Sequence, residues 1–211
     1  MPDQDLEQAT AREDLCRFLA ACYYEPDAVL DQEKVFDAMT AAAQQLDPAL
    51  AAGTRRLGEA FAAQDLQALL ADYTRLFLGP PSPLAAPYGS IWLGGEDTAM
   101  QESTVALEGL YSEAGFEIDE ELGETPDHVA VELEFLYLLT FKRNEARRAG
   151  EEVAIAGWDQ LHDLFLRGHL GAWIAAFTQA VGAKAESAFY RELADLTERF
   201  VRIELERRPR T

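Results

Sequence analysis

The strongest structural signal in this chain is residues 124–136, which read ETPDHVAVELEFL. Thr125 is a good helix N-cap, and Pro126 suits the first helical position, where its missing N–H costs no hydrogen bond. Asp127 and His128 would then lie in the first turn, beside unpaired N–H groups at the positive end of the helix dipole. Apolar residues recur behind them at helical spacing, at Val129, Leu133, Leu136 and Leu139. We therefore predict a long helix that is anchored by its apolar face and presents Asp127 and His128 at an exposed tip.

The same periodicity predicts helices along nearly the whole chain. Apolar residues recur every three or four positions from Leu15 to Tyr23 and again from Phe189 to Ile203, while Pro26 and Gly150 mark breaks. No segment alternates between apolar and polar residues as a half-buried strand does. We predict an all-α fold, a single compact domain over residues 1–211 built as a bundle of about eight to ten helices.

One long irregular stretch, residues 79–97, interrupts this helical pattern. It is rich in proline and also contains Tyr88, Ile91, Trp92 and Leu93. Long loops in compact domains are usually either functional or disordered, and large aromatic residues are uncommon in disordered segments. We therefore predict that this proline-rich loop is functional.

The charge of the chain is strongly one-sided. There are 38 acidic and 18 basic residues, which give a formal net charge of −20. No Lys or Arg occurs from Leu76 to Phe141, and the basic residues gather instead at 142–148 and in a C-terminal tail at 199–210. This balance argues against nucleic acid and anionic membranes as partners, because both require a basic face. Two interpretations stay open: an acidic surface that keeps the protein soluble, or an acidic face that attracts a cationic partner.

The sequence also predicts the cellular compartment of the protein. The N-terminal residues are acidic and lack the basic and apolar regions of a signal peptide. The longest apolar run, residues 170–177, is far shorter than the ~18 residues that a membrane span requires. Cys16 and Cys22 are six positions apart in one predicted helix, so we expect two buried thiols rather than a disulfide or a metal pair. We predict a cytoplasmic protein without membrane insertion.

The sequence gives little support for catalysis. The chain has three histidines, none paired at the spacing of a zinc protease, and no glycine-rich phosphate loop. Asp127, His128 and Glu132 could share a helix face, but this is a weak metal signal. We expect His162 to be solvated and His169 to be packed between helices. The prediction is a protein that is not an enzyme and has no catalytic residues, no metal and no cofactor.

Several segments in order along the chain resemble the TorD/DmsD family of redox-enzyme maturation chaperones. The pattern E-x-P-D-H followed by E-L-x-F in residues 124–136 is similar to the signature of that family. The other segments that match are YTRLFLGP at 73–80, PYGSIWL at 87–93, HLGAW at 169–173 with Phe177, and Phe189-Tyr190. The loop sequence PYGSIWL is more similar to the DmsD branch than to the nitrate-reductase (NarJ) branch.

This resemblance implies a fold and a function. The fold would be a compact helical bundle, present as a monomer or a homodimer and sometimes domain-swapped. The function would be that of a cytoplasmic chaperone for a molybdopterin oxidoreductase of the dimethyl-sulfoxide-reductase type. It would bind the twin-arginine signal peptide and the apoprotein of the catalytic subunit, assist cofactor insertion, and release the precursor to the Tat translocase.

The resemblance also implies where the peptide would bind. Carboxylates can hold guanidinium groups through paired hydrogen bonds, and an aromatic, proline-rich groove can hold an apolar segment. For the polar end of the peptide we expect Asp127, His128 and Glu124. The residues expected to line or support the groove are Tyr88, Trp92, Leu93 and Phe77. Asp72 and Arg75 are second-tier candidates.

Three other interpretations are retained. The first is an assembly chaperone of the nitrate-reductase type, which binds a molybdoenzyme subunit that is not exported. The second is a small helical enzyme that uses Asp127 and His128 as acid and base, which would require a closed pocket and a strongly perturbed histidine. The third is a helical adaptor for an unspecified partner.

Overall fold

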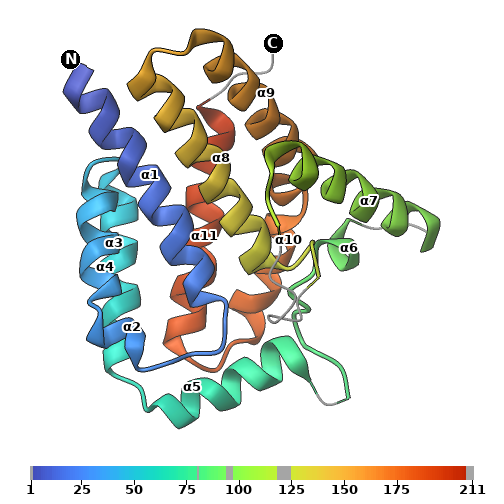
Figure 1. Cartoon of the computed structure of the whole chain (residues 1–211). Coiled ribbons are helices and arrows are strands. Elements are labelled where there is room, and N and C mark those ends of the chain that lie inside the picture. Colours follow the sequence, from blue (N-terminus) through green and yellow to red (C-terminus); the bar gives the residue numbers. More distant parts are fainter. Residues whose placement is uncertain (1, 80, 94–96, 118–124, 208–211) are drawn as a thin grey trace.

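The computed structural model describes residues 2–79, 81–93, 97–117 and 125–207, and it confirms the predicted all-α fold (Figure 1). These residues form eleven α-helices and one π-helix. The helices are α1 (Pro2–Cys22), α2 (Val29–Gln32), α3 (Val35–Gln44), α4 (Pro48–Ala62), α5 (Leu66–Tyr73), η1 (Thr74–Leu78), α6 (Gly89–Trp92), α7 (Asp97–Ala114), α8 (Val129–Ala149), α9 (Glu152–Gly168), α10 (Leu170–Lys184) and α11 (Ala188–Glu206). Within these residues, the β-type pairing is limited to one antiparallel bridge between Tyr88 and His128.

The long helices form the centre of the bundle. α1 and α8 pack against each other and run in opposite directions (Figure 1). α11 packs against α4 and α10, so that α3 and α4 cover one side of the bundle and α9 and α10 cover the other. One continuous cluster of buried apolar side chains joins these helices, with Leu15, Phe135, Trp173 and Phe200 among its members. The N-terminal end of α1 and the end of α8 lie at the same end of the bundle, and the start of α8 lies near α6 and α10 (Figure 1).

A π-helix connects the first half of the chain to the proline-rich loop. α5 widens after Tyr73 into η1, whose last hydrogen bond joins the Gly79 N–H to the Thr74 carbonyl oxygen at 2.8 Å. Gly79 then adopts a φ of 77°, a left-handed conformation that favours glycine. A Cβ atom here would lie 2.5 Å from the Ser82 carbonyl carbon. Gly79 therefore ends the helix and turns the chain sharply into the loop.

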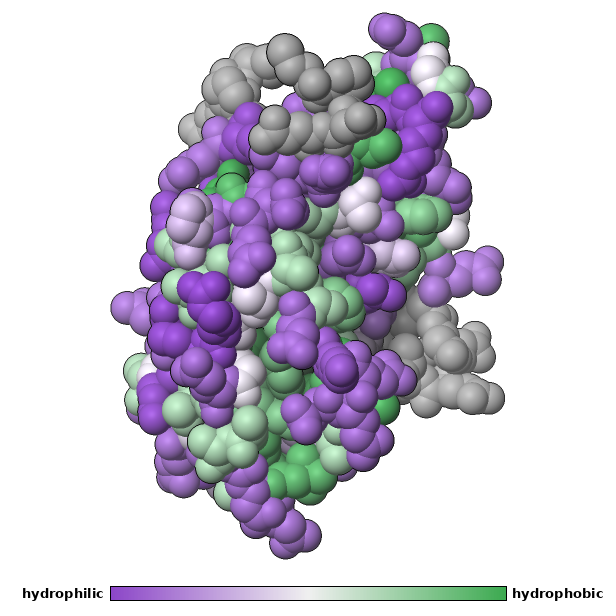
Figure 2. Space-filling view, turned by 90° about the vertical axis from the view of Figure 1, so that its left-hand side faces the viewer, coloured by the Kyte–Doolittle hydropathy of each residue, from purple (hydrophilic) through white to green (hydrophobic). Residues whose placement is uncertain are grey.

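The surface is mainly hydrophilic, as the composition predicts. On the face formed by α1 to α4, polar residues predominate and apolar residues gather in the lower half (Figure 2). Cys16 and Cys22 are both free thiols buried in α1, as expected. No helix in the part of the chain that the structure describes is long and apolar enough to cross a membrane.

Candidate functional site

The structure corrects the predicted start of the long helix. α8 begins at Val129 rather than at Pro126, and its N-cap is His128 rather than Thr125. The His128 ring nitrogen Nδ1 accepts a hydrogen bond from the Ala130 N–H at 3.2 Å, which satisfies one of the free donors at the helix start. Residues 125–128 form a turn, in which the His128 N–H donates to the Thr125 carbonyl oxygen at 3.1 Å. Asp127 and His128 thus precede the helix.

This turn is joined to the proline-rich loop by backbone hydrogen bonds. The Gly89 N–H donates to the Asp127 carbonyl oxygen, and the Val129 N–H donates to the Pro87 carbonyl oxygen, both at 2.8 Å. These two bonds flank the bridge between Tyr88 and His128. We call residues 87–90 and 127–129 together the clamp. The clamp brings together two of the sequence segments that resemble the chaperone family.

The side chain of Asp127 completes the clamp. One carboxylate oxygen accepts the Ser90 N–H at 2.9 Å, and the other accepts the Thr125 hydroxyl at 2.7 Å. Asp127 is 8% exposed, so the expectation of an exposed tip was wrong for this residue. The reason is that its carboxylate accepts a hydrogen bond from the Ser90 N–H at the start of α6, 37 positions away in the sequence. In this conformation its main role is to hold the loop.

His128 is also buried, and it is held in its neutral form. It is 2% exposed, and its ring lies against those of Tyr24 and Tyr88 at centroid distances of 6.1 and 5.4 Å. Burial lowers the pKa of His128 to about 4, and the nearby Asp127 charge offsets only part of that effect. The ring is therefore uncharged at neutral pH, and the expectation of an exposed tip was wrong for His128 as well.

Below the clamp, Glu132 and Trp173 form a buried pair. The indole N–H of Trp173 on α10 donates to the Glu132 carboxylate on α8 at 3.1 Å. Burial raises the pKa of Glu132 well above its ordinary value, which favours the protonated form. A Cβ atom on Gly89 would lie 2.8 Å from the Trp173 indole nitrogen and 3.1 Å from the Glu132 carboxylate. Only glycine therefore fits where the loop crosses this pair.

The aromatic residues expected at the groove are partly or fully packed. The Trp92 indole N–H donates to the Ala86 carbonyl oxygen at 2.8 Å, and its ring meets Phe177 edge to face. Tyr88, Trp92 and Leu93 are half-buried, whereas Phe77 is buried in the core. Phe77 can support a groove from below but cannot line one.

Three apolar side chains in this region are exposed instead. Leu78 at the end of η1, Leu84 in the loop and Ile91 on α6 are 57%, 42% and 55% exposed. The Ala85 N–H donates to the Leu76 carbonyl oxygen at 2.9 Å, which holds the loop alongside η1. Large exposed apolar side chains indicate contact surfaces when they gather in one region. Of these three residues, only Ile91 was among the loop residues on which the prediction of a functional loop rested.

An open pocket of about 360 Å³ lies next to the clamp. Its lining includes Pro126, Tyr111 and Phe116 together with the exposed carboxylates of Glu108 and Glu117. The Tyr111 hydroxyl donates to the Pro126 carbonyl oxygen at 2.7 Å, which fixes the pocket against the turn before α8. We call it the acidic pocket. Glu124, expected at the polar end of the peptide, lies outside the described residues.

Asp72 and Arg75 have structural partners. The Asp72 carboxylate accepts the Ser187 N–H at 2.8 Å and an Arg75 guanidinium N–H at 2.6 Å. Arg75 also donates to the Lys184 carbonyl oxygen at 2.6 Å. Burial tends to raise the pKa of Asp72, but these hydrogen bonds to Ser187 and Arg75 outweigh that effect and leave the pKa lowered. The pair thus joins α5 and η1 to the turn between α10 and α11.

The two other histidines lie in helix α9 and at its end. His162 is buried in α9, so the expectation of a solvated side chain was wrong. His169 is packed as predicted, stacked on Phe165 at the junction of α9 and α10, and burial lowers its pKa. Among the described side chains, no group of three or more His, Cys, Asp or Glu residues could hold a metal ion.

The hydrogen bonds of Asp127 give a first prediction. Asp127→Ala should reduce the free energy of unfolding by about 1–3 kcal/mol, because it leaves the Ser90 N–H and the Thr125 hydroxyl without their acceptor. Asp127→Asn should reduce it by less than about 1 kcal/mol, since an amide can accept from Ser90 and donate to Thr125. Urea unfolding measures both values. Equal losses in the two variants would mean that the charge of Asp127, rather than its hydrogen bonds, stabilises the clamp.

The lowered pKa of His128 gives a second prediction. Between pH 6.5 and about 4, the unfolded chain takes up a proton that folded His128 rejects, so stability should fall as the pH falls through this range. His128→Asn removes this titration and keeps an N-cap side chain. Relative to the variant, the wild type should lose up to roughly 3 kcal/mol over that range, measured by urea unfolding at each pH. Parallel pH curves for the two proteins would contradict the neutral, buried histidine.

Comparison with known proteins agrees with the motifs. The sequence model described as nitrate reductase delta subunit matches residues 43–179, which include both halves of the clamp. The chain is 30% identical over 138 residues to the chaperone protein TorD of Vibrio parahaemolyticus, a match that covers 64% of this chain and 62% of the relative.

Two further relatives carry related names. The chain is 31% identical to a perchlorate reductase assembly chaperone protein of Dechloromonas aromatica, over 64% of this chain and 61% of the relative. It is 29% identical to the Tat proofreading chaperone DmsD of Salmonella paratyphi A, over 59% of this chain and 54% of the relative. The matched region thus spans less than two thirds of the length of each relative. The family match covers well over half of this chain, which therefore belongs to the nitrate reductase delta subunit family, the TorD/NarJ family of redox-enzyme maturation chaperones that its motifs resemble.

Proposed function

We propose that this protein is a cytoplasmic chaperone that binds the twin-arginine signal peptide of a molybdopterin oxidoreductase of the dimethyl-sulfoxide-reductase type. It holds the apoprotein of the catalytic subunit while the cofactor is inserted and then releases it to the Tat translocase. The relatives, which include an assembly chaperone and a Tat proofreading chaperone, support this proposal. The protein itself carries out no catalysis in this function.

One structural observation carries the proposal: the clamp joins the turn that lines the acidic pocket to α6, the helix that carries the exposed Ile91. Pro126 lines the acidic pocket, and the adjacent Asp127 is hydrogen bonded to the start of α6, which carries Ile91. α6 also packs against α7, the helix that supplies Glu108. A twin-arginine signal peptide has two guanidinium groups followed by an apolar segment. The arrangement offers a carboxylate-lined position for the first part and an apolar surface for the second.

The burial of Asp127 and His128 changes the roles that we propose for the candidate residues. Asp127 and His128 position the loop, and Tyr88, Trp92, Leu93 and Phe77 support it from the core side. Glu108 and Glu117 meet the arginine groups of the peptide, together with Glu124. Asp72 and Arg75 hold η1 in place and contact no peptide in this arrangement.

The enzyme interpretation has less support. Nδ1 of His128 is occupied by the Ala130 N–H, and the ring is 2% exposed. A general base needs access to the proton that it abstracts. The nitrate-reductase type of assembly chaperone remains the second candidate, because the matching family model is described by that subunit. A chaperone of that type would bind the apoprotein but not the signal peptide.

The acidic pocket gives a third prediction. Glu108→Gln with Glu117→Gln should weaken binding of a synthetic twin-arginine signal peptide by about tenfold, because it removes both carboxylates of the described pocket lining. The control is Glu59→Gln with Glu113→Gln, an equal change of net charge at exposed positions outside the pocket. Isothermal titration calorimetry measures both. Equal weakening would mean that net charge, rather than the pocket, attracts the peptide.

Binding of the signal peptide, compared with binding of the apoprotein, separates the two chaperone types. Replacement of both arginines of the peptide by lysine should weaken binding, because lysine cannot form the planar pair of hydrogen bonds. Absence of binding to any signal peptide of a molybdoenzyme from the same organism, with binding to an apoprotein retained, would support the nitrate-reductase type instead.

The exposed apolar side chains give a fourth prediction. Leu84→Ser with Ile91→Ser should weaken peptide binding by about tenfold, through loss of apolar area that the peptide buries. The control is Val153→Ser with Leu164→Ser, two exposed apolar residues on α9. Calorimetry with the same peptide measures the difference. Full affinity in the loop variant would place the apolar part of the peptide elsewhere.

A further inference from the structure

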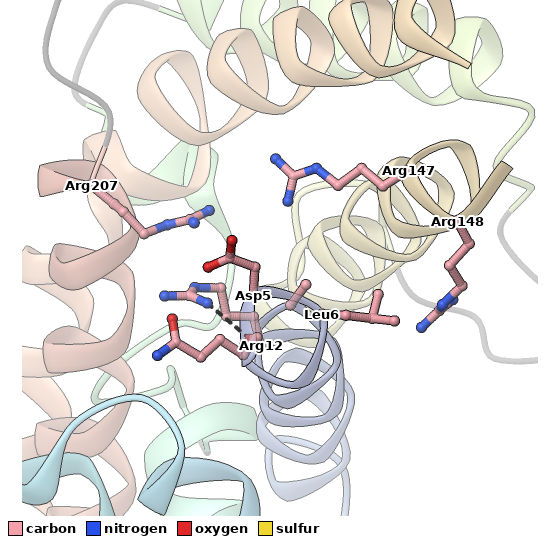
Figure 3. A pocket seen from close by; sticks show the side chains of 8 residues that line it. Asp5, Leu6, Arg12, Arg147, Arg148 and Arg207 are labelled. Atoms are coloured by element: carbon pink, nitrogen blue, oxygen red, sulfur yellow. Dashed lines mark hydrogen bonds between the residues drawn. The ribbon is translucent and has the colours of Figure 1, made fainter. Parts of the chain in front are cut away.

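A second pocket lies at the opposite end of α8 and has the opposite charge. Its volume is about 580 Å³, and its lining contains four arginines from three parts of the chain. Arg12 comes from α1, Arg147 and Arg148 from the last turn of α8, and Arg207 from the end of α11 (Figure 3). Asp5 is the one acidic residue among the eight residues of the lining. This concentration of arginine is unexpected in a chain with a net charge of −20.

Two of the four arginines are held in place by a buried carboxylate. Glu204 accepts the Arg12 Nε–H at 2.9 Å, and its other oxygen lies 3.5 Å from an Arg207 guanidinium nitrogen. Arg12 also donates to the Gln8 carbonyl oxygen at 2.9 Å. Anchored guanidinium groups lose little conformational freedom when a ligand binds, so they are suited to recognise an anion.

The two arginines of α8 differ in their setting. An Arg148 guanidinium N–H donates to the Thr10 hydroxyl at 3.2 Å. The Arg147 side chain points into the pocket toward Arg207 and Asp5 (Figure 3). Among the described residues, the lining and Glu204 behind it carry four arginines and two carboxylates, a local surplus of positive charge.

Helix ends explain part of this arrangement. Basic residues in the last turn of a helix interact favourably with the negative end of its dipole, and Arg147 and Arg148 occupy that turn of α8. The dipole accounts for their position in the sequence. It does not account for guanidinium groups from three segments that converge on one hollow.

We propose that this pocket, which we call the arginine pocket, binds a small soluble anion that carries a phosphate or diphosphate group. Guanidinium groups match phosphate oxygens through paired hydrogen bonds, and the volume lies in the range of small-molecule sites. The 21 residues of α8 separate it from the clamp by roughly 30 Å, so it is distinct from the proposed peptide site. The proposal does not depend on the proposed function.

The test is calorimetry of the full chain with sodium pyrophosphate, in phosphate-free buffer at constant ionic strength. Pyrophosphate should bind one to one, and orthophosphate should bind more weakly because it reaches fewer arginines. Arg147→Gln with Arg207→Gln should weaken pyrophosphate binding at least about tenfold. Arg147→Gln alone, at an exposed position, should weaken it several-fold even if the double variant folds poorly. The matched control is Arg202→Gln, an exposed arginine of α11 outside the pocket, which should change the affinity less than about twofold.

Several results would overturn the proposal. One is the absence of heat with pyrophosphate, and another is an equal loss of affinity in the Arg202→Gln control. A third is binding of a glutamate-rich peptide or of anionic lipid vesicles without any binding of pyrophosphate, which would assign the pocket to a macromolecular partner. Binding of the twin-arginine peptide should be unchanged in the Arg147→Gln variant, so failure of this proposal is distinguishable from failure of the peptide site.

Discussion

The position of α6, at the end of the proline-rich loop, depends on one interaction, the hydrogen bonding of residues 87–90 to residues 127–129. The backbone bonds at 2.8 Å fix the register, and the Asp127 carboxylate fixes the start of α6. Since Gly89 crosses the Trp173–Glu132 pair without room for a side chain, the clamp also sets how closely the loop approaches α10. Both parts of the proposed peptide site are placed by it, because Pro126 lines the acidic pocket and Ile91 lies on α6.

The helical fold could be predicted from the sequence, because helical periodicity is local and persists along α8 and α11. The start of α8 could not, since Thr125-Pro126 fits a helix start as well as His128 does. Which residue begins the helix depends on Pro87, a residue distant in the sequence, whose carbonyl oxygen accepts a hydrogen bond from the Val129 N–H. The burial of Asp127 has the same origin, as its partner Ser90 belongs to another segment.

Other features of the site differ in how visible they are in sequence. A buried hydrogen bond of Glu132 could have been predicted from the sequence, because a carboxylate among buried apolar residues of a helix requires a partner such as Trp173. The arginine pocket could not have been predicted from the sequence, since its residues come together only when α1, α8 and α11 pack. Exposure of Leu78 and Leu84 likewise depends on how the loop lies against η1, which no local pattern determines.

The absence of Lys and Arg from Leu76 to Phe141 has a practical consequence. Trypsin cuts after Lys and Arg, so a complete digest leaves the loop, α6, α7 and most of α8 in one fragment that ends at Lys142. Amine-reactive cross-linkers find no lysine between Leu76 and Phe141 either. Mapping a bound partner on this surface will therefore require glutamate-specific proteolysis and carboxyl-directed coupling, chemistries that act on the acidic groups from which the surface is built.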